Sequence, residues 1–378
     1  MDQPKFCVLG AGHGGTAMAG HLSSMGFDVS LYNRGSARID PIVAEGGIDI
    51  ITDSPDQIPH GFMQIKLATT DIAKAIKGRD ILMIVVPATG HRFMAEQLAP
   101  HLVDGQVIVL NPGRTFGALE VLQTIRSLGC KADVVVAEAQ TFIYASRSTN
   151  PAQTKIFRIK NSIPVAALPA HRTPEIVKLL RTAFPQFVPG DNVMKTSLDN
   201  IGAIFHPAVT VLNAARIEST NGNFDYYTEG ITASVALILE KMDKERVTVA
   251  EGLGFRAMSA REWLYVAYDA AGRTLHEAMR ANRGYDGIKA PKTVFTRYIT
   301  EDIPMSLVPI ASLGRMIGCP TPVIESIIML GSILHERDYW EEGRTVEKLG
   351  LAGLTLKQIR RLILDGELEP DKPAAAST

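Results

Sequence analysis

A glycine-rich segment near the start of the chain constrains its fold more than any other feature. The segment FCVLGAGHGGTAMAGHL joins a short apolar run to glycines spaced G-x-G-x-x-G and then to a helical pattern. Gly10 permits a tight turn, Gly12 lets the backbone approach a pyrophosphate, and Gly15 allows close packing of helix on strand. The helix start, with His13 and Gly14, offers N–H groups and a positive dipole end. A bare glycine pattern can be a simple turn, but strand, helix and position together predict a dinucleotide-binding loop.

Short apolar runs rich in β-branched residues alternate with helical patterns through the first half of the chain. We expect strands at 5–10, 28–33, 80–87, 106–113 and 132–139, and a further strand within 162–170. These runs are hydrophobic throughout, as is typical of parallel strands covered on both faces. The pattern predicts an α/β fold whose N-terminal part, residues 1–190, is a doubly wound Rossmann-type domain.

Beyond this point the pattern changes to long helices with few strand signals. We expect helices at 196–219, 230–252, 259–280, 305–317 and 322–337. They predict a mainly α-helical second domain over residues 191–365. Residues 366–378 are small, polar and proline-containing, and we expect a disordered tail there.

Composition excludes several classes of function. Lys+Arg and Asp+Glu number 39 and 40, which gives a formal net charge of -1 and argues against binding to nucleic acid or to a charged membrane surface. Three distant cysteines without metal-ligand spacing predict no metal site and indicate a reduced, cytoplasmic protein. From the pattern of residues we expect neither a secretory signal nor a membrane-spanning segment. The apolar faces of the long helices leave room for a homodimer.

The end of the second expected strand bears on the choice of cofactor. An NAD-preferring site usually carries Asp or Glu there, to bind the ribose hydroxyls, but this chain has Asn33 and Arg34. A carboxylate would repel a 2′-phosphate, whereas a guanidinium binds it through charge-assisted hydrogen bonds. Arg34 could instead be an ordinary surface arginine in a turn. We expect NADP(H) to be favoured over NAD(H), with Pro87 under the cofactor and the segment NPGRTFGA in the same crevice.

A histidine followed by a proline interrupts the apolar run IFHPAVTVLNAARIES. If 196–217 is helical, Asp199, His206, Thr210 and Asn213 share one polar face, and such a face borders a wet cleft. Thr210 and Asn213 are then candidate substrate ligands. Pro207 has no N–H, so the helix begins there or is distorted there. On these residues alone, His206 is a catalytic base or a packed structural histidine, and the second is the commoner case.

The segment TRYITEDIPMSLVPI holds a second group of functional side chains. Asp302 facing His206 could hold the imidazole tautomer and stabilise the imidazolium, as general acid–base catalysis requires. Arg297 could bind a substrate carboxylate with both oxygens. The alternative is an ordinary surface ion pair, which the sequence does not refute.

The chain resembles the opine dehydrogenases, above all their bacterial, norvaline-type members. The resemblance runs through VLGAGHGGTAMAGHL, HPAVTVLNAARIES, YYTEGIT, TRYITEDIP…LVPI and EGRTVEKLGLAGLT. It implies the family's reaction, in which a nicotinamide cofactor reduces the imine formed from a 2-oxoacid and an amine, usually an amino acid's. It also implies that His206 is catalytic, that Asp302 is its partner and that Arg297 binds substrate. Because the norvaline-type enzyme carries aspartate where Asn33 stands, its NAD preference is not carried over.

Two other functions remain open. A simple NAD(P)H-dependent reductase of 2-oxoacids or ketones could share this fold, although such relatives commonly use a lysine as acid and no lysine stands out here. A non-catalytic NADP(H)-binding module would have no need of His206, Arg297 and Asp302. We therefore expect an oxidoreductase acting on CH–NH donors, with a small 2-oxoacid and an amino acid or amine as its partners.

Overall fold

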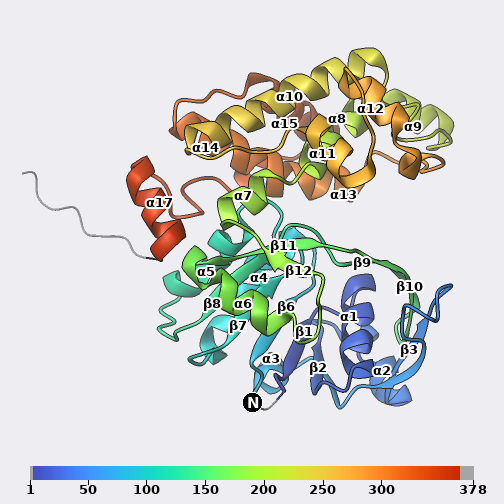
Figure 1. Ribbon diagram of the computed structural model, residues 1–378, viewed down its shortest axis with the longest axis vertical. Helices are drawn as coiled ribbons and strands as arrows, with labels where there is room; N and C mark the ends of the chain where they lie inside the picture. The colour runs from blue at the N-terminus through green and yellow to red at the C-terminus, as the bar shows by residue number, and fades with distance from the viewer. Residues whose placement is uncertain (1–2, 367–378) are drawn as a thin grey trace, which may run out of the picture.

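In a computed structural model, which describes residues 3–366, eight strands form one large sheet beneath a helical domain (Figure 1). The strand order is β12-β11-β8-β7-β6-β1-β2-β5. The strands are β1 (Phe6–Leu9), β2 (Val29–Tyr32), β5 (Leu67–Thr69), β6 (Ile81–Ile84), β7 (Val107–Leu110), β8 (Val135–Ala139), β11 (Ile163–Leu168) and β12 (Phe187–Pro189). All six predicted runs contain strands of this sheet.

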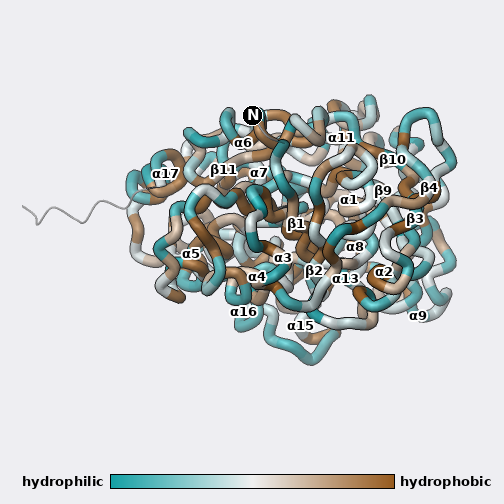
Figure 2. Tube along the Cα trace, turned by 90° about the horizontal axis from the view of Figure 1, so that it is seen from below, coloured by the Kyte–Doolittle hydropathy of each residue, from teal (hydrophilic) through white to brown (hydrophobic). Residues whose placement is uncertain are grey.

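The centre of this sheet is parallel and buried. β1 pairs in parallel with β2 on one side and with β6 on the other, and β6, β7 and β8 continue in parallel. Every residue of these five strands is buried, which explains their uninterrupted apolar sequences. The brown, hydrophobic tube around β1 runs through the middle of the molecule (Figure 2). The strand order changes direction at β1, because β2 and β5 lie on one side of it and β6, β7 and β8 lie on the other. A crevice forms at this point, at the carboxyl ends of the strands.

A second, smaller sheet was not expected from the sequence. Its order is β4-β3-β10-β9, and it packs against one face of the first helix. The strands are β3 (Gly47–Ile51), β4 (Gly61–Gln64), β9 (Tyr144–Asn150) and β10 (Gln153–Ile159). β9 and β10 are longer than the central strands but partly exposed, so their polar sequences lack the apolar signal used to find the large sheet.

Helices cover both faces of the large sheet, as expected for a doubly wound domain (Figure 1). They are α1 (His13–Ser24), α2 (Asp40–Glu45), α3 (Ile72–Ile76), α4 (His91–Leu98), α5 (Gly117–Ser127) and α6 (Thr173–Leu180). Four short 3₁₀ turns accompany them: η1 (Ser36–Arg38), η2 (Ala88–Gly90), η3 (Ala99–His101) and η4 (Ala170–Arg172).

The second domain is helical, but its elements are shorter than expected. They are α7 (Val193–Leu198), α8 (Gly202–Leu212), α9 (Ala214–Thr220), α10 (Ala233–Gly252), α11 (Ala260–Tyr268), α12 (Leu275–Ala281), η5 (Arg283–Tyr285), α13 (Arg297–Thr300), the π-helical η6 (Ile303–Leu307), α14 (Val308–Met316), α15 (Pro322–His335), α16 (Tyr339–Glu342) and α17 (Leu356–Asp365). The helix predicted at 196–219 is three helices, and the one predicted at 259–280 is two. The hydrophobic periodicity of a helix continues across a short break, so the sequence pattern did not reveal these interruptions.

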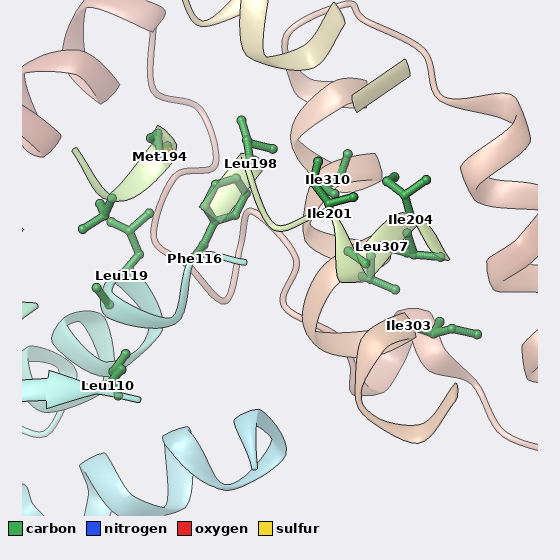
Figure 3. Close-up of a cluster of buried hydrophobic side chains, with 14 of the residues drawn as sticks. Leu110, Phe116, Leu119, Met194, Leu198, Ile201, Ile204, Ile303, Leu307 and Ile310 are labelled. Carbon is green, nitrogen blue, oxygen red and sulfur yellow. The ribbon is translucent and has the colours of Figure 1, made fainter. Parts of the chain in front are cut away.

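The two domains share one hydrophobic core. Figure 3 shows side chains of the α5 region, among them Phe116 and Leu119, beside side chains of α7, α8, η6 and α14. Glu138, at the end of β8, accepts hydrogen bonds from the Thr196 and Ser197 hydroxyls of α7, at 2.8 and 2.7 Å. Burial raises the pKa of this carboxyl group. These contacts fix the start of the helical domain on the sheet that bears the glycine loop.

The last described helix returns to the N-terminal domain. α17 packs on η4 and β11, although the sequence assigned it to the helical domain (Figure 1). The predicted disordered tail lies, from residue 367 on, outside the described residues. Within 3–366, no helix is long and apolar enough to cross a membrane. The same residues contain no cluster of His, Cys, Asp and Glu that could hold a metal ion.

Candidate active site

The glycine loop connects β1 to α1 in the way that its spacing predicts. Gly10 has φ = +117°, and a Cβ there would lie 2.5 Å from the carbonyl oxygen of Val85. A Cβ on Gly15 would lie only 1.6 Å from the carbonyl oxygen of Gly10, so helix and strand approach too closely for a side chain. A Cβ on Gly12, by contrast, would meet no atom within 4 Å. The loop therefore presents bare backbone to open space at the N-terminus of α1, as a pyrophosphate requires.

A cavity of about 630 Å³ extends from this loop over the carboxyl ends of β1, β2 and β6. Gly10, Gly12, Asn33, Arg34 and Pro87 all line it, so the structure brings these predicted cofactor residues together. Bare backbone at one end and cationic side chains at the other fit a dinucleotide with its phosphates. The residues present are therefore compatible with the cofactor that the sequence predicted.

Asn33 and two arginines form the end of this cavity next to β2. The Asn33 Oδ1 atom accepts a hydrogen bond from the Ala11 N–H at 3.1 Å, so the side chain that replaces the usual acid holds the glycine loop. Arg34 lies over the ring of Phe93, with 5.3 Å between guanidinium carbon and ring centroid. Arg38, which was not predicted, also lines the cavity and donates to the Ala11 carbonyl oxygen at 3.4 Å. This end of the cavity carries two cations and no carboxylate among its lining residues.

His13 and Gly14 connect the glycine loop to the second sheet and to β8. The backbone N–H of Ser148 in β9 donates to His13 Nδ1 at 2.9 Å, so this ring faces the second sheet. A Cβ on Gly14 would lie 2.6 Å from the ring of Phe142, which follows β8. Both residues thus hold the loop in place through their neighbours, and their backbone belongs to the start of α1.

His206 lies in α8, on the side of the helical domain that faces the sheet. Pro207 does not start this helix but lies inside it, where it removes one hydrogen bond in the second turn. His206 Nδ1 lies 2.8 Å from Asp302 Oδ2, and Nε2 lies 3.1 Å from the Tyr227 hydroxyl. The ring of Tyr298 stacks on the imidazole at a centroid distance of 4.4 Å. The imidazole is held on both nitrogens and one face, yet its side chain stays 20% exposed.

Asp302 and Glu301 connect this histidine to the N-terminal domain. Asp302 precedes η6, a π-helical turn of the kind often found at functional sites, and its side chain is 1% exposed. Its Oδ1 atom lies 3.0 Å from Arg114 Nη1, and Glu301 Oε1 lies 3.5 Å from Arg114 Nε. Glu301 Oε1 also accepts from the Ala88 N–H at 2.9 Å. The two acids thus bridge α13 and η6 to the turns that follow β6 and β7.

Arg114 is the main site residue that the sequence analysis missed. It follows β7 in the segment NPGRTFGA, and its φ of +56° is unusual for a residue with a side chain. Burial would lower the pKa of Arg114, but the charges of Asp302 and Glu301 outweigh it and raise the pKa. The signal available was an arginine in a glycine- and proline-containing turn at the carboxyl end of a strand, where strained residues often serve function.

Arg297 is placed near the loop as well as near the histidine. It begins α13, its side chain is 64% exposed, and its Nε and Nη2 atoms lie 2.6 and 2.5 Å from Glu301 Oε2. Burial lowers the pKa of His13, and the charges of Arg38, Arg147 and Arg297 lower it further. The charge of Arg297 therefore acts at His13 in the glycine loop, and more than half of the Arg297 side chain is exposed.

His206, Thr210 and Asn213 lie along α8 and its C-cap, but the last two make contacts inside the helical domain. Thr210 is fully buried, and its hydroxyl bonds to the His206 carbonyl oxygen and the Tyr226 hydroxyl, both at 2.8 Å. The Asn213 amide donates to the carbonyl oxygens of Val209 and Gly230. Both side chains hold the helical domain together, and this placement does not support their predicted role as substrate ligands.

Asp199 belongs to a different helix from His206. It ends α7, before the break that precedes α8, and its carboxylate pairs with Lys195 at 2.8 Å. The helical wheel that placed the two side chains together assumed one continuous helix. The break between α7 and α8 changes the rotation between Asp199 and His206, so Asp199 does not lie on the same helix face as His206.

Two family models match the chain, one in each domain. Residues 5–113 match the N-terminal domain of NAD-dependent glycerol-3-phosphate dehydrogenase. Residues 189–335 match the alpha-helical domain of NAD/NADP octopine/nopaline dehydrogenase. The second match covers His206, Arg297 and Asp302, and its start at residue 189 lies close to the predicted domain boundary.

Comparisons over the whole length agree with these matches. Octopine dehydrogenase, solved with NADH and L-arginine and with NADH and pyruvate, superposes with TM-scores of 0.81 and 0.80 at 19% identity, over 98% of this chain and 100% of that one. Yersinopine dehydrogenase with NADP⁺ gives 0.73 at 14% identity, over 96% and 98%. The opine dehydrogenase of Arthrobacter sp. (strain 1C) is 39% identical over 96% of this chain and 99% of its own. With this identity over almost its full length, the chain belongs to the opine dehydrogenase family, whose members are NAD(P)-dependent oxidoreductases acting on CH–NH donors.

Proposed function

We propose that this enzyme condenses a 2-oxoacid such as pyruvate with the amino group of an amino acid and reduces the resulting imine. The pairing of His206 with Asp302, which also contacts Arg114 of the N-terminal domain, is the observation that carries this proposal. Overall, oxoacid, amine, NAD(P)H and a proton give the N-substituted amino acid, NAD(P)⁺ and water. A nicotinamide cofactor held by its pyrophosphate at the glycine loop would supply the hydride. Octopine dehydrogenase structures hold L-arginine or pyruvate beside NADH, which is the pair of substrate classes proposed here.

His206 would exchange protons with the reacting substrates through its Nε2 atom. Nδ1 faces a carboxylate, which accepts but does not donate when ionised, so Nδ1 carries the hydrogen in this arrangement. Nε2 then has a lone pair, and the Tyr227 hydroxyl donates to it. Imine formation moves a proton from the amine and another onto the departing water, and a histidine near neutral pH can serve both transfers. Asp302 stabilises the imidazolium that forms in between.

Arg297 would bind a substrate carboxylate. More than half of its side chain is exposed, and Glu301 orients its Nε and Nη2 atoms from one side. A planar guanidinium can hold both carboxylate oxygens and so fix the carbonyl carbon of an oxoacid. The octopine dehydrogenase complexes place such substrates in a protein of the same fold.

NADPH would be the preferred reductant. Asn33 is occupied in holding the glycine loop, and Arg34 and Arg38 line the cavity where an acid would repel a 2′-phosphate. Two guanidinium groups can neutralise most of the charge of that phosphate. The complex of yersinopine dehydrogenase with NADP⁺ shows that this fold accommodates the phosphorylated cofactor.

Cofactor oxidation under three conditions tests the function. We expect rapid oxidation of NADPH with pyruvate plus a mixture of amino acids, and slow oxidation with pyruvate alone or with neither. The same rate with pyruvate alone would make the protein a simple oxoacid reductase. No oxidation with any oxoacid–amine pair, despite tight NADPH binding, would make it a non-catalytic cofactor-binding module.

A further inference from the structure

A partly buried lysine lies at the same edge of the sheet as Arg114, and the function proposed above gives it no role. Lys160 follows β10, and its backbone N–H donates to the Ile143 carbonyl oxygen at 2.9 Å. Its Nζ atom donates to the Thr141 hydroxyl at 2.6 Å. Thr141 follows β8 and Arg114 follows β7. These strands are parallel neighbours, so both segments leave the sheet at its carboxyl edge.

Lys160 has no acidic partner among residues 3–366. Arg114 interacts with two carboxylates, and Lys155, which lies within β10, pairs with Asp53 at 2.8 Å. Burial, and after it the charge of Arg114, together lower the pKa of Lys160 to about 8. A cation that is buried without a counter-ion is costly, and an anionic ligand removes that cost.

The proposed reaction involves two substrate carboxylates. An oxoacid and an amino acid carry one each, and both remain in the product on either side of a secondary amine. On the protein side, Arg114, Lys160 and Arg297 are cationic and Glu301 and Asp302 are anionic. These residues leave one positive charge in excess, and protonation of His206 adds a second. Two substrate carboxylates would balance both charges, but Arg297 alone can hold only one of them.

We propose that Lys160, together with the Thr141 hydroxyl, binds one of the two substrate carboxylates. This assignment rests on the proposed function, and it deepens that function by naming a second carboxylate site on the N-terminal domain. Because Lys160 Nζ donates to Thr141 Oγ1, the hydroxyl hydrogen of Thr141 is left to donate to another acceptor. One carboxylate can therefore take a hydrogen bond from the ammonium group and another from the hydroxyl. Arg297, on the helical domain, serves the other carboxylate.

The test separates a carboxylate ligand from a structural lysine. KM and kcat are measured for the wild type, Lys160→Met and Lys160→Arg, with pyruvate and an amino acid taken from the active mixture. The same amino acid is also supplied as its carboxamide, which lacks the charge. Lys155→Met is the matched control, because Lys155 lies in the strand that precedes Lys160 but pairs with Asp53. Thermal unfolding shows whether each variant is folded.

Two patterns support the proposal. If the amino acid's carboxylate binds Lys160, Lys160→Met raises the KM of the amino acid at least tenfold and that of the carboxamide less than twofold. If the oxoacid's carboxylate binds there, the KM of pyruvate rises instead. In either case Lys160→Arg restores part of the loss and Lys155→Met changes little. The proposal is overturned if neither KM rises more than twofold, or if the carboxamide loses as much as the amino acid. A fall in kcat at unchanged KM also overturns it and makes Lys160 a proton donor.

A failure of the proposed function is recognised separately. In that case the wild type itself shows no amine-dependent oxidation of NADPH. Calorimetric titration of pyruvate and of L-alanine into the NADP⁺-loaded wild type and Lys160→Met then decides the role of Lys160. Weaker binding of either anion to the variant supports the carboxylate site. Equal binding, or binding to neither protein, overturns it.

Discussion

His206 and Asp302 lie 96 positions apart in the chain, yet Nδ1 of the one is 2.8 Å from Oδ2 of the other. The carboxylate is almost fully buried, whereas the imidazole keeps 20% of its side chain exposed. Burial of the acid and partial exposure of the base are what an orienting pair requires, because only the base has to reach substrate. A purely structural histidine would gain nothing from an exposed edge.

Removing the imidazole should abolish most turnover. We expect His206→Ala to lower kcat about a hundredfold or more while the Kd for NADPH stays within a factor of two, because the cofactor cavity does not include this residue. Asp302→Asn should also lower kcat, since an amide can present the wrong atom to Nδ1. Steady-state kinetics and cofactor titration measure these effects. Near-wild-type turnover in a folded His206→Ala variant would make the histidine structural.

Cofactor choice should depend on Arg34. We expect the wild type to have a higher kcat/KM with NADPH than with NADH. Arg34→Ala should weaken NADPH binding by roughly 1.5–3 kcal/mol, the typical value of a hydrogen bond to a charged group, and leave NADH nearly unchanged. Arg92→Ala is the control, because this arginine is on the nearby α4 but pairs with Glu96 at the surface. A wild type that prefers NADH would contradict the proposal.

The elements that the sequence predicted best are those with the same environment along their whole length. β6 is buried on both faces from Ile81 to Ile84, so its apolar run indicates a central parallel strand. In β9 only Tyr144 is buried, and the strand is otherwise partly or fully exposed and largely polar, so the same signal was absent. The glycine loop was predictable because its spacing is a backbone requirement, which Gly10 and Gly15 still show in three dimensions.

The site was predictable only in part, because its remaining contacts are long-range. Arg114 meets Asp302 across 188 positions, and no local pattern in either segment refers to the other. In the sequence Lys160 resembles any lysine at the end of a strand. Its role is suggested only by Arg114 and Thr141, which follow the neighbouring strands β7 and β8. The role predicted for Thr210 came from a helical wheel, which gives the direction of a side chain but not its neighbours, and its neighbour is the Tyr226 hydroxyl.

The buried pair of Arg344 and Glu120 should hold the two domains together. Arg344 is fully buried and its Nε lies 2.7 Å from Glu120 Oε2 in α5. We expect Arg344→Met to lower the free energy of unfolding by about 3–5 kcal/mol, because Glu120 would be left as an unpaired buried charge. Adding Glu120→Gln should recover part of this loss. Arg337→Met removes an exposed pair with Glu342 and should cost less than about 1 kcal/mol in the same urea titrations. Equal losses of unfolding free energy in Arg344→Met and Arg337→Met would refute the role of Arg344 in holding the domains together.

Stability should fall in mild acid because of His21. Burial lowers the pKa of this histidine from 6.5 to about 4, and its Nδ1 atom lies 2.9 Å from the Tyr144 hydroxyl. Between these two pKa values the unfolded chain binds a proton that the folded chain does not, so the free energy of unfolding falls as pH decreases from 6.5 to 4. The loss is at most about 3 kcal/mol. His21→Gln should show a correspondingly smaller fall between pH 7 and pH 4. An identical pH profile would show that His21 titrates normally.

The final prediction concerns Arg297, whose guanidinium is held by Glu301 but mostly exposed. A lysine there would keep the charge but lose the planar pair of donors. We expect Arg297→Lys to raise the KM of the oxoacid and also to lower kcat, because the reacting carbon is less well fixed. The KM of the amine should change less. A selective rise for the amino acid would reassign Arg297 to that substrate, and Lys160 would then serve the oxoacid. Unchanged kinetics with a lower melting temperature would mean that Arg297 only anchors Glu301. Measuring both KM values and the melting temperature on the same preparation separates these three roles.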